Sequence, residues 1–251
     1  MKQFFIPRCT ILLLLILTIL FAGCNKTINT IYINESLTAK GKLIYDNNFE
    51  ESLDDWKVEQ MPEGTVEVKD GKLEINDAAG CTIWLKEEFE GPIMIEYEAL
   101  VIENGGLNDR VSDLNCFWMA KDPENPTNLF KKSEERGGKF SNYDSLQLYY
   151  MGLGGHYNTK TRFRRYLGNG YRPLLPEHDL TDSKFLITPN KLNKIKIIAF
   201  DGIIQYYRND TLMVDFHDTN PYTSGYFGFR TVNNHMTVDN FKVYKLSSKN
   251  E

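Results

Sequence analysis

Short runs of alternating apolar and polar residues, separated by turn signals, most constrain what this chain can fold into. In residues 93–101 (IMIEYEALV) one alternating set is almost wholly apolar, as in a strand with one buried face. The dipeptides Asp70-Gly71 and Asp201-Gly202 each separate two such runs and indicate β-hairpins. Helical periodicity is limited to short turns. The chain is therefore predicted to form an all-β sandwich or barrel.

The N-terminal residues indicate export. Lys2 and Arg8 precede an apolar run of 12 residues at 11–22, which is shorter than the roughly 20 residues of a membrane-spanning helix. Small residues then precede Cys24, as in a bacterial lipoprotein signal. We predict a lipoprotein signal peptide over residues 1–23, lipidation of Cys24 and anchoring to a bacterial membrane outside the cytoplasm, in the periplasm or at the cell surface. An ordinary cleaved signal is the alternative.

The rest of the chain divides into a tether and one domain. Residues 24–41 are polar and unpatterned, which predicts a flexible tether, and residues 42–251 suit one β-sandwich. Cys81 and Cys116 both lie in strand-like runs of this domain. An oxidising compartment permits a disulfide between them, and two buried free thiols are the alternative. The sequence has no CxxC pattern for a zinc site.

Residues 145–172 form a basic and aromatic island in a chain whose formal net charge is -5. The island contains six aromatic residues and no Asp or Glu. Its five cations are Lys160, Arg162, Arg164, Arg165 and Arg172. This composition predicts a site for a flat, anionic ligand, because arginine pairs with carboxylates and tyrosine rings stack on sugars. The alternative is an arginine-rich surface that pairs with acidic residues elsewhere.

Strand alternation divides the island into two faces. Residues 161–167 place Arg162, Arg164 and Tyr166 on one face and Phe163 on the other. In the preceding strand Gln147 and Tyr149 share a face, and we expect that face to join the two arginines in one cleft. Residues 152–158 are then the turn that brings His156 and Tyr157 to the rim.

Longer motifs resemble a known fold and a known family. The opening NFEESLDDWKVE with DGKLEI, and the closing SGYFGFRTVNNHMTVDNFKVYKL, resemble the first and last strands of concanavalin A-like jelly-roll domains. The middle motifs NDRVSDLNCFWMAKDPENP, YYMGLGGHYNTKTRFRRY and RPLLPEHDL are similar to the uncharacterised, secreted bacterial YesU-like proteins. The resemblance covers roughly residues 42–246. It implies a jelly-roll β-sandwich of two antiparallel sheets and a setting of polysaccharide degradation, without implying a reaction.

Elimination at a uronate sugar is the chemistry that the island favours. It needs a cation for the carboxylate, a base for the C5 proton and an acid for the leaving oxygen. The catalytic candidates are His156, His178, Tyr149 and Tyr166. The substrate-binding candidates are Arg162, Arg164, Gln147, Tyr157, Asn115, Trp118 and Arg172.

Two other groups of carboxylates have simpler interpretations. Residues 104–115 are rich in oxygen ligands for calcium, but the spacing is not that of an EF-hand, and pairing of Arg110 with Asp113 is favoured. Glu96 and Glu98 alternate along one strand, as on a solvated face, and the E-x-D-x-E strand of jelly-roll glycosidases is absent. We predict no cofactor, with calcium as the alternative.

These observations together predict a carbohydrate-active lipoprotein that acts on an acidic, uronate-containing glycan. Lyase chemistry is favoured over hydrolysis, and a non-catalytic carbohydrate-binding module is the main alternative. An exported acidic protein is not expected to bind nucleic acid, and its only expected link to the membrane is the lipid anchor. Nothing in the sequence determines the oligomeric state.

Overall fold

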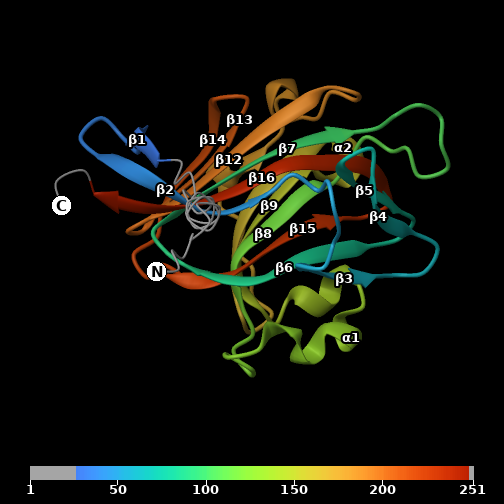
Figure 1. Cartoon of the computed structure of the whole chain (residues 1–251), viewed down its shortest axis with the longest axis horizontal. Coiled ribbons are helices and arrows are strands. Elements are labelled where there is room, and N and C mark those ends of the chain that lie inside the picture. The colour runs from blue at the N-terminus through green and yellow to red at the C-terminus, as the bar shows by residue number, and fades with distance from the viewer. Residues whose placement is uncertain (1–26, 249–251) are drawn as a thin grey trace, which may run out of the picture.

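The computed structural model describes residues 27–248, which form two stacked antiparallel sheets (Figure 1). The larger sheet has the order β1 (Thr27–Tyr32), β2 (Thr38–Asn47), β16 (Asn234–Ser248), β7 (Ile93–Val101), β12 (Leu192–Phe200), β13 (Ile203–Arg208) and β14 (Thr211–His217), and β5 (Lys72–Asp77) joins β16 to β4 (Thr65–Lys69). The smaller, seven-stranded sheet has the order β11 (Asp179–Leu180), β10 (Lys160–Leu167), β9 (Gln147–Gly154), β8 (Leu114–Lys121), β15 (Ser224–Thr231), β6 (Cys81–Glu90) and β3 (Trp56–Gln60). The predicted all-β architecture is confirmed.

Helical structure in residues 27–248 is limited to single turns in the connections. These turns are η1 (Leu129–Lys132), α1 (Ser133–Arg136), η2 (Phe140–Tyr143), α2 (Gly155–Asn158), η3 (Pro176–His178) and η4 (Ser183–Phe185), where η marks a 3₁₀ turn. Three of them lie in one connection, between β8 and β9.

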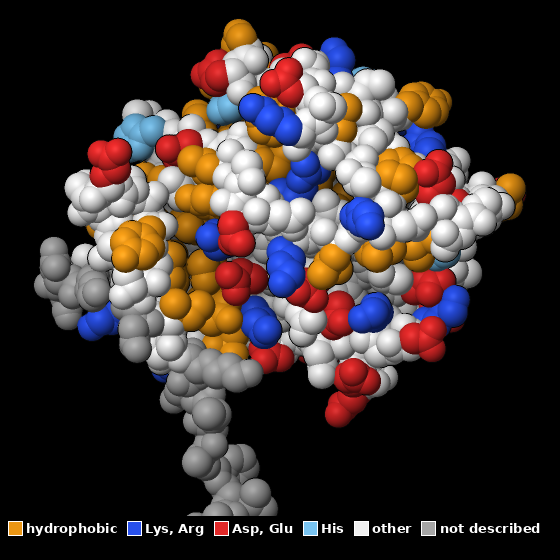
Figure 2. Space-filling model, turned by 90° about the horizontal axis from the view of Figure 1, so that it is seen from above, with side chains coloured by type: hydrophobic (Ala, Val, Ile, Leu, Met, Phe, Trp, Pro, Cys, Tyr) orange, Lys and Arg blue, Asp and Glu red, His pale blue; other side chains and the backbone are white. Residues whose placement is uncertain are grey.

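Alternation along β7 builds the core as expected. The side chains that point between the sheets are at most 2% exposed, and they are Ile93, Ile95, Tyr97, Ala99 and Val101. Removing such side chains from water stabilises the fold by about 1.5–3 kcal/mol for each large one. Glu96 and Glu98 lie on the outer face, where their cross-strand neighbours include Lys196 and Lys194. Figure 2 shows acidic and basic side chains interspersed over the face seen from above.

The two cysteines of the domain are free. Both thiols are fully buried, and β15 separates the strands that carry Cys81 and Cys116. Burial raises the pKa of Cys116 to about 12 and also raises the pKa of Cys81. Of the two alternatives left open by the sequence, the structure therefore has buried thiols, which stay protonated and unreactive.

The prediction of a tether over residues 24–41 is wrong from Thr27 onward. Strand β1 pairs with β2, and Ile31 and Ile33 are only 7% and 2% exposed. They pack over the outer face of the larger sheet near Phe200, and Gln205 Nε2 donates to the carbonyl oxygen of Ile33 at 2.9 Å. The sequence gives no strand pattern here, because only a few isoleucines of this segment are buried against the larger sheet. The predicted signal peptide and Cys24 lie outside the described residues, and no helix within 27–248 is long and apolar enough to span a membrane.

Residues 122–146, called here the covering segment, lie on the outer face of the seven-stranded sheet. Figure 1 shows α1 of this segment beneath the sheet, beside β3 and β6. The segment packs Leu129, Tyr143 and Leu146 over Trp84 and Phe117 of the sheet, and all five side chains are at most 1% exposed. The long connection is therefore an ordered second layer over the sheet.

A buried ion pair holds the covering segment in place. Arg136 donates from Nε and Nη2 to the two carboxylate oxygens of Glu59 at 3.1 and 2.6 Å, and the hydroxyl of Tyr143 donates to the same carboxylate at 2.7 Å. The side chains of Arg136 and Glu59 are 3% and 1% exposed. Arg230 of β15 also donates to the carbonyl oxygen of Gly138 at 2.6 Å.

Replacing Arg136 by methionine is expected to destabilise the protein by about 3–5 kcal/mol, because the carboxylate of Glu59 is then buried without its partner. Urea denaturation of the purified domain measures this loss. The matched control is Lys57→Met, which breaks an exposed pair with Glu134 and should cost at most about 1 kcal/mol. Equal effects of the two substitutions would contradict the role of the buried pair.

Candidate functional site

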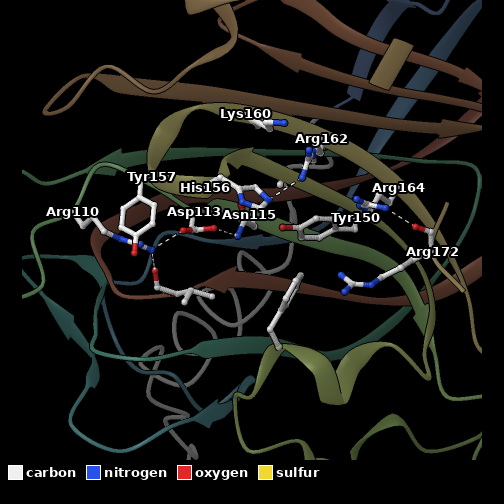
Figure 3. A pocket seen from close by; sticks show the side chains of 14 residues that line it. Arg110, Asp113, Asn115, Tyr150, His156, Tyr157, Lys160, Arg162, Arg164 and Arg172 are labelled. Atoms are coloured by element: carbon white, nitrogen blue, oxygen red, sulfur yellow. Dashed lines mark hydrogen bonds and ion pairs between the residues drawn. The ribbon is translucent and has the colours of Figure 1, made fainter. Parts of the chain in front are cut away.

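A pocket of about 250 Å³ opens on the outer face of the seven-stranded sheet, beside the covering segment (Figure 3). Strands β8, β9 and β10 form its floor, and the α2 turn forms part of its rim. Its ionisable lining residues are mostly cationic and are Arg110, Asp113, Tyr150, His156, Tyr157, Lys160, Arg162, Arg164 and Arg172. Four of the five cations of the basic island thus line one cavity, while Arg165 pairs with Asp218 outside it.

Sheet register sets the floor of the pocket. Asn115 of β8, Gly152 of β9 and Arg162 of β10 lie opposite one another across the three strands. Gly152 leaves room for the ring of Tyr150, because a Cβ atom at position 152 would lie 2.5 Å from the Tyr150 hydroxyl oxygen. That hydroxyl makes no hydrogen bond to another described residue. Burial raises the pKa of Tyr150, so the phenol stays protonated.

Arg162 forms hydrogen bonds with both the carboxylate of Asp179 and the ring of His156. Its guanidinium donates to both oxygens of Asp179, at 2.8 and 3.2 Å, and Nη1 lies 2.8 Å from Nε2 of His156. Because arginine can only donate, Nε2 of His156 accepts this hydrogen bond and carries no proton. The hydrogen bonds from Arg162 are the main reason that the pKa of Asp179 is lowered.

Arg164 differs from the other arginines of the pocket because it has no carboxylate partner among residues 27–248. Its Nη1 donates to the carbonyl oxygen of Arg172 at 2.6 Å. Burial lowers the pKa of Arg164, and the nearby cations Arg172 and Arg162 lower it further. The guanidinium nevertheless stays charged at neutral pH. By contrast, Arg172 pairs with Asp144 at 3.3 Å. Arg164 is therefore a partly buried cation without a counter-charge.

The far end of the pocket is built from the loop before β8 and the α2 turn. Arg110 pairs with Asp113 at 2.8 Å, which confirms the predicted pairing, and its guanidinium lies 4.9 Å from the ring centre of Tyr157. His156, Tyr157 and Asn158 all have positive φ angles of 54–58°, a left-handed conformation that is costly for residues other than glycine. Two hydrogen bonds of 2.8 Å between the Asn158 side chain and the backbone of Ile187 hold the turn.

The prediction that Tyr149 and Gln147 share the face of Arg162 is wrong. Tyr150 occupies that face instead, opposite Arg164, while Tyr149 points into the core and donates its hydroxyl proton to Asp218 at 2.7 Å. Seven of the eight residues of β9 are buried, because the core covers one face and the covering segment the other. The usual polar and apolar alternation is therefore absent, and the sequence did not indicate which tyrosine faces the pocket.

Three other candidates lie outside the cavity. Trp118 is fully buried between the sheets, Tyr166 is buried beneath Arg172, and His178 is 5% exposed. The ring of His178 packs edge-on against Phe163 at 4.9 Å, and burial lowers its pKa. Phe163 itself lies in the core, as predicted.

The remaining predicted site residues do meet at the pocket. They are His156, Tyr157, Arg162, Arg164, Arg172 and Asn115. Tyr150, Lys160 and Arg110 also line the pocket but were not among the predicted binding residues. Tyr150 and Lys160 lie within the basic and aromatic island, whereas no sequence signal linked Arg110 to it. Residues 27–248 contain no group of three or more His, Cys, Asp or Glu side chains placed to hold a metal ion.

Two stacked antiparallel sheets with a pocket on the outer face of one define the chain as a jelly-roll β-sandwich, which confirms the predicted fold. A model of the family described as "Domain of unknown function (DUF6250)" matches residues 75–241. The chain therefore belongs to this family. No curated protein matches it.

Several solved structures share the fold at low identity. A Bacillus subtilis protein of unknown function with a galectin-like fold is 19% identical, with a TM-score of 0.65 over 81% of this chain and 96% of that chain. The carbohydrate-binding module CBM66 from Bacillus subtilis is 15% identical, with a TM-score of 0.51 over 74% and 93%. An endo-β-1,3-glucanase from Pyrococcus furiosus is 15% identical, with a TM-score of 0.54 over 88% and 99%.

The carboxyl of Asp179 is expected to titrate below the ordinary aspartate pKa of about 3.9. Its pairing with Arg162 therefore stabilises the pocket above that pH and is lost as the pH falls through the lowered pKa. Carbon-13 NMR of the labelled carboxyl groups measures the titration. Arg162→Met should return the pKa to its ordinary range, whereas Lys160→Met should change it far less. An ordinary pKa in the unsubstituted protein would contradict the pairing.

Proposed function

We propose that the pocket binds the carboxylate of a uronate-containing glycan. The observation that carries this proposal is Arg164, a half-buried guanidinium without a carboxylate partner in the described chain. Five cations line the cavity, against one lining carboxylate, Asp113. A ligand carboxylate would supply the missing counter-charge and accept paired hydrogen bonds from Arg164. Tyr157 at the rim, 77% exposed, offers a ring face for a sugar.

The folds that resemble this one support a carbohydrate ligand. Two of the similar structures are a carbohydrate-binding module and an endo-β-1,3-glucanase. The same sandwich thus serves both binding and catalysis, and the reaction has to be argued from the residues of the pocket.

β-Elimination suits the pocket better than hydrolysis. Glycoside hydrolysis generally needs two carboxyl groups on either side of the bond, and the one that lines this pocket, Asp113, is already bonded to Arg110. In an elimination the C5–H bond breaks and gives its proton to a base, the C4–O bond breaks and the leaving oxygen takes a proton from an acid, and a C4–C5 double bond forms. His156 has an unprotonated Nε2 for the first transfer, and the protonated phenol of Tyr150 suits the second.

One observation favours a binding module as the second candidate. The lone pair of His156 Nε2 already accepts a hydrogen bond from Arg162, so the base is free only after that contact breaks. A module would hold the glycan through Arg164 and the tyrosine rings and leave its bonds intact.

Incubation with a panel of uronate polysaccharides distinguishes these functions. A lyase generates unsaturated uronates that absorb ultraviolet light, a hydrolase generates new reducing ends without that absorbance, and a module generates neither. His156→Ala should abolish turnover and preserve binding if the protein is a lyase.

The proposal extends to location. Export and lipidation of Cys24 would place the pocket outside the cytoplasm, where a polymeric glycan is accessible. Labelling with a radioactive fatty acid in a bacterial host tests this, with Cys24→Ser as the control. Labelling that persists in Cys24→Ser would contradict an anchor at this residue.

Replacing Arg164 by methionine is expected to weaken binding of a uronate oligosaccharide about 30-fold, because a charged hydrogen bond worth about 2 kcal/mol is lost. Isothermal titration calorimetry measures the affinity. The matched control is Lys191→Met, which removes an exposed cation outside the pocket and should leave the affinity unchanged. Equal affinities of the Arg164→Met variant and the unsubstituted protein would exclude Arg164 as the carboxylate ligand.

A further inference from the structure

The pocket is short because side chains close it at two ends. At one end Arg110 stacks on Tyr157, with 4.9 Å between the guanidinium carbon and the ring centre. At the other end Arg172 stacks on Phe140 at 5.4 Å. Pockets for drug-sized ligands have volumes of about 300–1,000 Å³, so the 250 Å³ between these two walls suits about one sugar ring. Figure 3 shows Tyr157 and Arg172 on opposite sides of the central residues Asn115 and Tyr150.

The covering segment occupies the rest of the sheet face. It packs on Trp84 and Phe117, which would otherwise be exposed beside the pocket on the same face. Phe140, which closes one end of the pocket, belongs to this segment. Without the segment, the face would offer an open aromatic surface that continues from the cationic residues, where a run of several sugars could lie.

The covering segment is fixed too firmly to act as a lid. Its Arg136 is paired with Glu59 in the interior, and its Gly138 lies directly on the chain at Gly80. A Cβ atom at Gly138 would be 2.4 Å from the carbonyl oxygen of Gly80, so the two backbones are in contact. Arg230 also donates a hydrogen bond to the carbonyl oxygen of Gly138, which holds this part of the segment in place. Moving the segment would expose a buried ion pair and an apolar cluster, and the cavity therefore keeps its size.

From this geometry we infer that the site accepts a single uronate unit, either at the end of a glycan chain or in a short oligosaccharide, and does not hold an internal run of a polymer. This inference rests on the proposed function and deepens it. The bound unit lies between the two stacked walls with its carboxylate on Arg164. Further units extend from the mouth of the pocket into solvent and add little to the affinity, because they make no enclosed contacts.

Calorimetry with uronate oligosaccharides of one to six units tests the inference on the unsubstituted protein. The expected result is an affinity that changes by less than about threefold from two units to six. A rise of more than about tenfold over that range would overturn it and would leave the proposed function standing. Absence of binding at every length, with carboxyl-reduced oligosaccharides as the control, would instead remove the proposed function.

Phe140→Ala provides the matching variant. Removal of this ring opens the closed end toward the covering segment, and longer oligosaccharides should then gain affinity over shorter ones. The circular dichroism spectrum reports whether the variant remains folded. If Phe140→Ala is folded and the affinity remains independent of length, the ring is not the wall that limits the site, and the inference is wrong in that respect.

Discussion

The covering segment is held to the seven-stranded sheet by a carboxylate and a guanidinium that are almost fully withdrawn from water. Desolvation of Glu59 and Arg136 is costly, and the bidentate geometry together with the hydroxyl of Tyr143 offsets that cost. Such a pair tolerates little displacement, because any opening leaves charges buried without partners. The position of the segment determines which part of the sheet remains open, and the pocket occupies that part. The geometry of the site thus depends on an interaction outside it.

Charge around the pocket is unevenly compensated, and the proposed anionic ligand would meet that difference. Arg110, Arg162 and Arg172 each have an aspartate partner from the protein, which neutralises and orients them. Arg164 has none, so among the arginines of the pocket it is the one left with an uncompensated charge. The chain as a whole carries a net charge of -5, and at long range it repels an acidic glycan. At 0.1 M salt, charges act over only about 10 Å, so Arg164 would attract an anionic ligand only at short range. This short range favours specificity over rapid capture.

Sequence patterns predicted the fold more completely than the site. Alternation in β7 and the Asp-Gly turns identified the sandwich, because one face of those strands is polar. Pattern failed where tertiary packing covers both faces. After Gln147 every residue of β9 is buried, so Tyr149 and Tyr150 could not be told apart. It also failed at β1 and the residue that follows it. Ile31 and Ile33 are too few to form a recognisable pattern, although both are buried against the outer face of the larger sheet. The basic island was located correctly because an excess of arginine is a local property, whereas Arg110 reaches the pocket from about fifty residues earlier in the chain.

The left-handed α2 turn fixes the backbone at the rim of the pocket during folding, before a ligand binds. Three consecutive residues with positive φ are unfavourable, and the hydrogen bonds of Asn158 to Ile187 keep them in that conformation. The backbone of His156 and Tyr157 therefore loses its freedom when the protein folds, before any ligand arrives. A glycan that docks against this rim does not have to immobilise it, and the loss of conformational entropy on binding falls mainly on the sugar.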